Sequence, residues 1–372
     1  MLRAEAIVDL DAIRGNVATL KAGTSAEVLA VVKADGYGHG LIASARASLD
    51  GGATWLGTAT IDESLALRAD GITAPMLAWL WTPGEFDAVR KTVDADIDLS
   101  VSSAWQLALV AQAARDLGRR ARVHLKVDTG LSRNGAYRDD WPALVGAVAR
   151  EDAVEPVGVW SHFAYADEPG HPTIGKQLAA FRDALAIAES HGVRPTLRHI
   201  ANSAATLTLP GAHFDLVRPG IAVYGLTPVP QHGDFGLVPA MTLRASLALV
   251  KRVRAGEGVS YGHAYTTERD TTLALVPLGY ADGIPRHAGN VGPVCIGGRR
   301  FTISGRVCMD QFVVDVGDLP VTERDEAVLF GAGRDGEPRA QDWADAIGTI
   351  HYEIVTRVGA RVPRTYRGGS AR

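Results

Sequence analysis

The chain has 372 residues, of which 47% are hydrophobic and 22% are charged, and its formal net charge is −4. This length exceeds that of one typical domain, and the composition is that of a globular chain with a large core, so we expect two domains. The weak negative charge argues against nucleic acid as a partner. The two cysteines, Cys295 and Cys308, are too few for a disulfide framework or a four-cysteine zinc site, and we expect no bound metal.

The sequence carries no sign of export or of membrane insertion. Its first residues lack the apolar core of a signal peptide. A charge-free apolar stretch of about 18 residues, the length of a membrane span, is also missing. The cytoplasm is therefore the expected location, and a membrane is not an expected partner.

Short apolar runs rich in β-branched residues alternate with amphipathic helical stretches up to about residue 226. Two clear helical patterns cover Ser102–Leu117 and Gly175–Ser190. The predicted strands are Val28–Lys33, Thr54–Thr58, Met76–Leu80, Ile97–Val101, Ala121–Val127, Pro156–His162, Thr196–Ala201 and Leu216–Arg218. Strands that alternate with helices in this way predict a parallel (β/α)8 barrel. An open doubly wound sheet is the alternative, but Gly36, Gly38 and Gly40 lack the glycine spacing of a dinucleotide-binding turn.

Lys33 ends the first predicted strand, in the segment Val28–Gly40. A lysine at the end of a buried strand is costly unless it reaches solvent or performs a function. Tyr37, between two loop glycines, favours the functional interpretation.

Candidate site residues end or follow several other predicted strands, which places them at one end of the barrel. The polar ones are Arg133, His162, Asn202, Ser203 and Arg218, and Gly220 and Ile221 come directly after the last strand. Barrel enzymes place their sites at the carboxyl ends of the strands, and the last loops often bind phosphate. Backbone N–H groups and a serine hydroxyl are suitable donors for such a phosphate.

The chain changes character after a segment rich in proline, glycine and polar residues, Thr227–Gly236, which we interpret as a linker. The strands predicted beyond it are Met241–Val253, Thr271–Leu278, Gly292–Ile296, Phe301–Ile303, Gln311–Val316 and Glu326–Phe330, with a helix at Arg339–Gly348. We therefore expect a barrel domain at residues 1–233 and a mostly β domain at 234–372.

Motifs along nearly the whole chain resemble those of the alanine racemase family. They are Val32–Gly40, His124–Gly130 with Arg133, Ser161–Phe163, His199–Ser203, Val217–Ile221, Val259–Gly262, Leu278–Gly283, Gly305–Asp310 and Arg361–Arg364. The resemblance implies a (β/α)8 barrel followed by a mostly β domain. It also implies interconversion of L-alanine and D-alanine, which supplies D-alanine for peptidoglycan, with pyridoxal 5'-phosphate as cofactor.

The family resemblance assigns the catalytic pair. Lys33 matches the lysine that attaches the cofactor and acts as one base, and Tyr261 matches a second base on the opposite face of the substrate. Two opposed bases suit the inversion of a stereocentre, because one lysine does not easily reach both faces. A turn tyrosine that caps a strand is the alternative for Tyr261.

The same resemblance assigns the residues around the cofactor. Arg218 matches the arginine that faces the pyridine nitrogen; the alternative is an ion pair with Asp215 or another carboxylate. His162 and Arg218 match residues that in this family connect to Tyr261 and to the cofactor. The residues that match phosphate-binding positions are Tyr37, Ser203, Gly220, Ile221 and Tyr352, and Asn202 is a further expected cofactor-binding residue.

Substrate contacts and assembly also follow from the resemblance. Arg133 and Met309 match residues that hold the substrate carboxylate, although a methionine is more often a core residue. Lys126 matches a lysine that is often carbamylated in this family; a bond to Asp128 is the alternative. Because Tyr261 and Met309 reach the site from the partner subunit in this family, a head-to-tail homodimer is implied.

Four other interpretations remain open at the level of sequence. A racemase for serine or another amino acid keeps Lys33 and Tyr261 but has a different pocket. A barrel-type decarboxylase uses a Cys-Asp element where this chain has Cys308-Met309-Asp310. A non-catalytic cofactor-binding protein resembles the barrel alone, and a sugar or phosphate barrel lacks the cofactor.

Overall fold

The computed structural model describes residues 2–369, which divide into two compact units. The barrel unit comprises residues 13–36 and 41–237. The β unit comprises the chain up to residue 12, residues 37–40 and the chain from residue 238. The sequence analysis places residues 1–12 with the barrel, whereas the structure groups them with the β unit. The reason is strand β1 (Ala4–Asp9), which pairs with strands at Met241–Ser246 and Arg364–Arg367.

The barrel unit contains a parallel sheet that is eight strands wide among the described residues, and the predicted barrel is confirmed. Its strands are β2 (Glu27–Val31), β3 (Trp55–Thr58), β4 (Met76–Ala78), β5 (Asp98–Val101), β6 (Ala121–Lys126), β7 (Val154–Trp160), β8 (Leu197–His199) and β9 (Leu216–Val217). Backbone N–H groups of Asp215 and Arg218 donate to Arg198 and Ala201, which brings β8 and β9 together. The two ends of the sheet therefore meet and the barrel is nearly closed.

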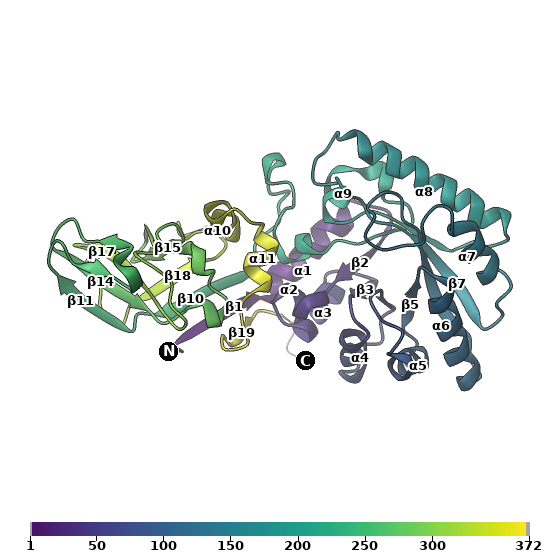
Figure 1. The fold of residues 1–372 in the computed structure, drawn as a ribbon, viewed down its shortest axis with the longest axis horizontal. Coiled ribbons are helices and arrows are strands. Elements are labelled where there is room, and N and C mark those ends of the chain that lie inside the picture. The colour runs from purple at the N-terminus through teal and green to yellow at the C-terminus, as the bar shows by residue number, and fades with distance from the viewer. Residues whose placement is uncertain (1, 370–372) are drawn as a thin grey trace. The chain divides into compact units, whose positions relative to one another are not determined.

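Helices cover the outside of this sheet, as Figure 1 shows for α4 to α8. The helices are α1 (Leu10–Ala22), α3 (Leu41–Asp50), α4 (Ile61–Ala69), α5 (Phe86–Asp94), α6 (Ala104–Leu117), α7 (Trp141–Val148), α8 (Pro172–Ser190) and α9 (Ser203–Thr208). The apolar faces of these helices and strands form the core; Val28, Leu56 and Leu125, for example, are fully buried. Each predicted barrel strand is present, with ends that differ by at most two residues.

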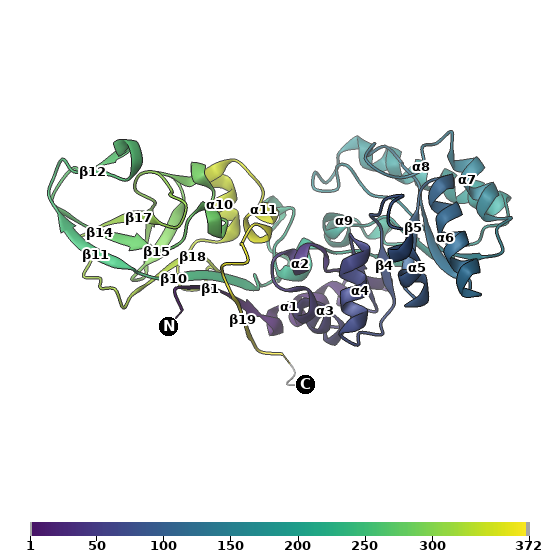
Figure 2. The same ribbon diagram turned by 60° about the horizontal axis from the view of Figure 1, so that its bottom comes forward.

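The β unit contains three sheets among the described residues. The largest has the order β16-β15-β18-β10-β1-β19, with strands β10 (Met241–Ser246), β15 (Pro293–Ile296), β16 (Arg299–Thr302), β18 (Glu326–Phe330) and β19 (Arg364–Arg367). A second consists of β11 (Leu249–Val253), β14 (Thr271–Val276) and β17 (Phe312–Gly317), side by side in Figure 2. A short pair, β12 (Gly258–Val259) and β13 (Tyr265–Thr266), and two helices, α10 (Ala340–Ile347) and α11 (His351–Thr356), complete the unit.

One strand prediction in this unit is wrong. The run Met241–Val253 is not one strand, because it breaks at residues 247–248 and its halves join different sheets. The backbone N–H groups of Leu247 and Ala248 donate to Asp325 and Leu275, so the chain is held by a different neighbour on each side of the break.

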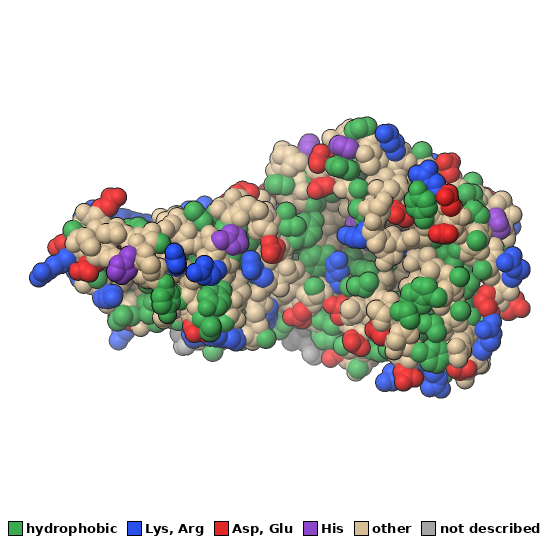
Figure 3. Space-filling model, viewed as in Figure 1, with side chains coloured by type: hydrophobic (Ala, Val, Ile, Leu, Met, Phe, Trp, Pro, Cys, Tyr) green, Lys and Arg blue, Asp and Glu red, His purple; other side chains and the backbone are tan. Residues whose placement is uncertain are grey.

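The surface carries no extended patch of one charge on the face seen in Figure 3, where basic and acidic side chains are interspersed over both units. Within residues 2–369, no helix combines the length and the apolar character needed to cross a bilayer.

Candidate active site

The prediction that Lys33 ends the first strand is wrong. Lys33 instead begins a left-handed turn two residues beyond the end of β2. The segment Lys33–Tyr37, labelled α2, has positive φ at Ala34 (54°), Asp35 (54°), Gly36 (61°) and Tyr37 (52°). A left-handed conformation costs roughly 1–2 kcal/mol for each residue other than glycine. Backbone strain of this kind persists only where the surroundings enforce it, and it is frequent at functional sites.

Three hydrogen bonds hold this turn. The N–H of Ala34 donates to Glu63 Oε1 (2.6 Å), and the N–H of Gly36 donates to the carbonyl of Val32 (2.8 Å). Asp35 Oδ1 accepts the N–H of Leu41 (2.8 Å). The turn therefore fixes where the Lys33 side chain leaves the backbone.

A cluster of cationic side chains surrounds Lys33 within the barrel unit. Burial, followed by the charge of Arg133, lowers the pKa of Lys33. Burial lowers the pKa of Lys126 to about 7, helped by the charges of Arg218 and Arg133. His162 has its pKa well below the usual value for the same reasons, burial first and Arg218 second. Lys33 and Lys126 are therefore neutral more often than a lysine in water, and the imidazole of His162 is neutral.

Arg218 is a deeply buried cation of this cluster, with 5% of its surface exposed. Its guanidinium donates to the carbonyls of Ser161 (2.7 Å) and Ile200 (3.3 Å), and it lies 4.7 Å from the centre of the Trp160 ring. Burial lowers its pKa to about 9. Lys126 lies over the same ring at 4.2 Å, so one indole contributes to the stability of two buried cations.

The alternative interpretation of Arg218 as the partner of Asp215 is wrong. Asp215 instead binds Arg198, with oxygens 2.6 and 2.9 Å from the guanidinium nitrogens. The ion pairs found among residues 2–369 give Arg218 no carboxylate. A buried charge without a counter-charge is expensive, so this arginine is available to a ligand that accepts hydrogen bonds.

Ser203, Gly220 and Ile221 lie together after β8 and β9. The hydroxyl of Ser203 accepts the N–H of Gly220 (2.8 Å), which precedes a short 3-10 helix at Ile221–Tyr224. Asn202 caps α9, with its Oδ1 accepting the N–H of Ala205 (3.1 Å). These loops are the ones that carry phosphate in many barrels.

Other predicted site residues belong to the β unit. Tyr37 is buried, with its ring 6.3 Å from the ring of Tyr352 on α11. Burial, together with Tyr352, raises the pKa of Tyr37. Gly38 fits tightly against the same helix, because a Cβ at this position would lie 2.4 Å from the carbonyl oxygen of Val355.

Tyr261 and Met309 are also in the β unit, and both are exposed, with 72% and 54% of their surface accessible. Tyr261 begins a 3-10 helix directly after Ser260, whose φ is 61°. The hydroxyl of Ser260 donates to the carbonyl of Arg306 (2.8 Å). Tyr261 is therefore presented to the surface by a fixed turn.

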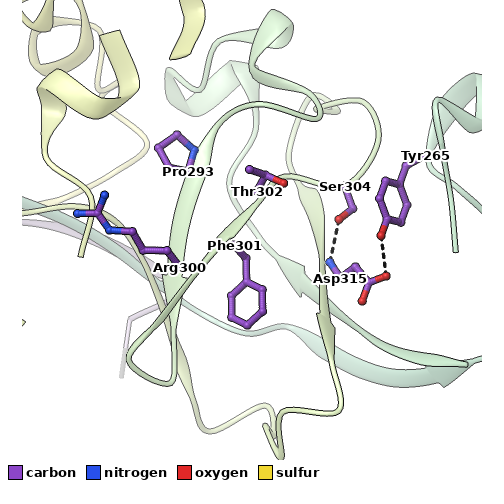
Figure 4. Close-up of a pocket in the computed structure, with 7 residues that line it drawn as sticks. All are labelled: Tyr265, Pro293, Arg300, Phe301, Thr302, Ser304 and Asp315. Carbon is purple, nitrogen blue, oxygen red and sulfur yellow. Dashed lines mark hydrogen bonds between the residues drawn. The ribbon is translucent and has the colours of Figure 1, made fainter. Parts of the chain in front are cut away.

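A pocket of about 420 Å³ in the β unit is not a site of this kind. Figure 4 shows Tyr265, Ser304 and Asp315 grouped together, whereas Arg300 extends away from them. The hydroxyl of Tyr265 donates to Asp315 (2.8 Å), and the backbone N–H of Asp315 donates to Ser304 (2.9 Å). These three residues therefore use their hydrogen-bonding groups on one another, and nothing in their arrangement points to a ligand.

Three polar residues inside the barrel had no role assigned from the sequence, although two of them begin the motifs His124–Gly130 and His199–Ser203. They are Asp98 on β5, His124 on β6 and His199 on β8, all almost fully buried and linked by hydrogen bonds. Polar residues at inward positions of otherwise apolar strands were the available clue. Their common hydrogen-bond network depends on strand pairing, which the sequence alone does not contain.

A parallel barrel with a neutralisable lysine, a second buried lysine and an unpaired buried arginine at the carboxyl ends of its strands defines a barrel enzyme. Comparisons with known proteins specify the family. Residues 8–228 match the model of the alanine racemase N-terminal domain, and residues 240–366 match that of the alanine racemase C-terminal domain.

Alanine racemases from several organisms are similar to this chain over nearly its full length. That of Salinispora arenicola is 63% identical over 99% of both chains, and that of Thermobifida fusca is 59% identical over 98% of both. The crystal structure of alanine racemase from D-cycloserine-producing Streptomyces lavendulae has a TM-score of 0.98 at 57% identity, covering 100% of this chain and 98% of that one. The structure from Bacillus anthracis with bound L-Ala-P has a TM-score of 0.91 at 35% identity, covering 99% and 96%.

The chain therefore belongs to the alanine racemase family and is an amino-acid racemase, an isomerase. The predicted family is confirmed. Because both family domains match, the interpretation as a cofactor-binding barrel alone is excluded.

Proposed function

We propose that this racemase interconverts L-alanine and D-alanine by a two-base mechanism with pyridoxal 5'-phosphate as its cofactor, and so supplies D-alanine for peptidoglycan. The observation that carries the proposal is the pair formed by Lys33, with its lowered pKa, and Arg218, buried without a carboxylate among the described residues. A cytoplasmic location stays a prediction from the sequence.

The donor set of the barrel unit fits this cofactor. Arg218 can only donate hydrogen bonds, and an unprotonated pyridine nitrogen accepts one. Ser203 uses its oxygen to accept the N–H of Gly220, which leaves its hydroxyl hydrogen for a phosphate oxygen. The proposed phosphate ligands are Tyr37, Asn202, Ser203, Gly220, Ile221 and Tyr352, and His162 stands beside Arg218 at 3.4 Å.

Bound pyridoxal phosphate supplies an electron sink that makes the α-proton of an attached amino acid acidic. Lys33 holds the cofactor and then takes or returns this proton at its Nζ. Its lowered pKa favours that role, because a base must be neutral to accept a proton. Tyr261 exchanges the proton on the opposite face through its hydroxyl oxygen.

The substrate carboxylate is bound by Arg133 and Met309 in this proposal. Arg133 supplies a permanent charge and a planar set of donors suited to a carboxylate. Met309 contributes its backbone N–H, so its exposed side chain is not required for the contact.

We propose a head-to-tail homodimer in which each β unit completes the other subunit's site. The support is the exposure of Tyr261 and Met309, at 72% and 54%. A base in open solvent is poorly suited to proton abstraction from carbon, because water screens the charges that the reaction must stabilise. A partner surface would provide the missing cover.

The experiment that tests this function is α-proton exchange in deuterated water, with L-alanine and D-alanine offered separately to the protein loaded with pyridoxal phosphate. Deuterium in both enantiomers, together with racemisation, is the expected result. A loaded protein that exchanges no deuterium into either enantiomer contradicts the proposal.

Serine serves as the comparison substrate, since a racemase for a larger amino acid would exchange serine at least as fast. Sedimentation at several protein concentrations tests the dimer separately. A monomer that retains full activity excludes a shared site.

A further inference from the structure

A continuous chain of hydrogen bonds crosses the interior of the barrel and ends at Arg218. His124 Nε2 lies 3.0 Å from Asp98 Oδ2, and His124 Nδ1 lies 2.8 Å from His199 Nε2. His199 Nδ1 then lies 3.0 Å from a terminal nitrogen of Arg218. Each side chain is 5% exposed or less, so water does not compete for these bonds.

The two ends of this chain fix the direction of every hydrogen bond. Arg218 can only donate, so His199 Nδ1 must be the unprotonated acceptor. A neutral His199 then carries its hydrogen on Nε2 and donates to His124 Nδ1. His124 carries its own hydrogen on Nε2 and donates to the carboxylate of Asp98, which can only accept.

The charge states agree with this direction. Burial, followed by the charge of Arg218, keeps the pKa of His199 well below its usual value, so the ring is neutral. Burial alone would raise the pKa of Asp98, but the hydrogen bonds from His124 and Arg122, together with the charge of Arg122, bring it below the usual value. The carboxylate therefore stays ionised at the far end of the chain.

The backbone makes room for this arrangement at one residue. Gly158 on β7 pairs with His124 on β6, directly after a bulge in the register of the two strands. A Cβ at position 158 would lie 2.2 Å from Nδ1 of His124. Bulges and close-contact glycines commonly redirect a side chain beside a functional site.

We propose that Asp98, His124 and His199 are positioning residues that fix the orientation of the Arg218 guanidinium. The charge of Asp98 is itself paired with Arg122, whose Nε lies 2.8 Å from Oδ1 of Asp98, so what reaches Arg218 through the two imidazoles is hydrogen-bond direction. This inference rests on the proposed function in one respect, namely that the oriented arginine donates to the pyridine nitrogen of the cofactor. Hydrogen-bonded imidazoles polarise one another, so an ionised carboxylate at one end strengthens the bond at the other. The chain thus orients a buried cation without placing a carboxylate where the ligand binds.

The first test measures the two histidine tautomers in the full-length protein by 15N nuclear magnetic resonance, before and after loading with pyridoxal phosphate. We expect both rings to be neutral and to carry hydrogen on Nε2. A hydrogen on Nδ1 of His199 overturns the proposal, whatever the activity. This measurement needs no variant, so it decides the matter even if the variants below do not fold.

The second test compares His124→Leu with His124→Gln. Leucine breaks the chain, whereas the glutamine amide can still donate to Asp98 and accept from His199. We expect His124→Leu to broaden or shift the guanidinium N–H signals of Arg218. It should also lower kcat roughly tenfold to a hundredfold, the usual cost of losing such a supporting contact, with KM for alanine nearly unchanged. In His124→Gln, the guanidinium N–H signals of Arg218 and kcat should both return part of the way to their original values.

His213→Leu is the matched control. His213 is also a buried histidine of the barrel unit that links two polar groups, Thr24 and the carbonyl of Thr206, but it lies outside the chain. If both leucine variants change the Arg218 signals and kcat equally, the effect is one of general packing and the proposal fails. If the NMR spectra show the expected tautomers but the protein has no racemase activity, the hydrogen-bonded chain is supported and the proposed function is contradicted.

Discussion

The barrel unit and the β unit present their proposed functional side chains in opposite ways. In the barrel, Lys126 and Arg218 are 4% and 5% exposed and are held by Trp160 and by backbone carbonyls. In the β unit, Tyr261 and Met309 are 72% and 54% exposed. The barrel therefore organises its half of the chemistry by internal packing, whereas these residues of the β unit need cover that their own unit does not provide.

The largest effect should come from breaking the barrel half at Lys33. Lys33→Ala removes both the cofactor attachment and one base, and we expect racemisation to fall by at least about 10⁴-fold in both directions. Steady-state rates with each enantiomer check this. Lys176→Ala changes an exposed lysine of the same unit and should leave the rates unaltered. Substantial racemisation by Lys33→Ala would remove Lys33 from the mechanism.

Tyr261→Phe should affect one direction of the chemistry more than the other. We expect exchange from one enantiomer to slow by about 10²–10⁴-fold. The free energy of unfolding should stay within about 0.5 kcal/mol of the original, because the side chain is exposed. Deuterium exchange with each enantiomer and a denaturant titration measure the two quantities. Tyr137→Phe, an exposed tyrosine of the barrel, is the control. Equal slowing for both enantiomers would argue against opposed bases.

Lys126 should make stability depend on pH. Its pKa is about 7 when folded and near the ordinary 10.5 when unfolded. The unfolded chain therefore binds more protons between these values, and the contribution of this group to stability rises with pH across that window. Lys126→Met should raise the free energy of unfolding by up to about 5 kcal/mol below pH 7, because each pKa unit corresponds to about 1.4 kcal/mol, and the gain should vanish as the pH approaches 10.5.

Denaturant unfolding at both ends of this pH window measures the effect. A carbamylated Lys126 would be an anion, and its variant would destabilise the protein at every pH instead. Intact mass under native conditions distinguishes the two cases.

The smallest effect should come from the β unit pocket. Tyr265→Phe removes the hydroxyl that donates to Asp315, a bond worth about 1 kcal/mol. Thermal unfolding should detect the loss, and racemase rates should not change. A clear loss of activity would show that this region takes part in the chemistry.

The sequence predicted the barrel because its pattern is local. Each strand is a short apolar run and each helix has its own period, so tertiary pairing is not needed to recognise them. Strand β1 was not predicted because its two partners lie more than 200 residues away in the chain. The left-handed turn was also missed, since alanine rarely adopts positive φ and aspartate, although it adopts it more often, does so in a minority of cases; Ala34 is held there by tertiary contacts.

The motifs that resemble the family named the residues of the candidate site but not their environment. Sequence left Arg218 with two possible partners, and only the structure assigned Asp215 to Arg198. The hydrogen-bonded chain of Asp98, His124 and His199 could not be predicted from the sequence, because it joins three strands that are distant in sequence.

Gly158 has a consequence for how this sequence can change over evolutionary time. The space that a side chain would need at this position is filled by the ring of His124. A relative that acquires a larger residue here must first lose or move that histidine, so the two positions should vary together or not at all. Distant relatives that keep histidine at the position of His124 should have glycine at the position of Gly158. A substitution at one of these two positions should be accompanied by a substitution at the other.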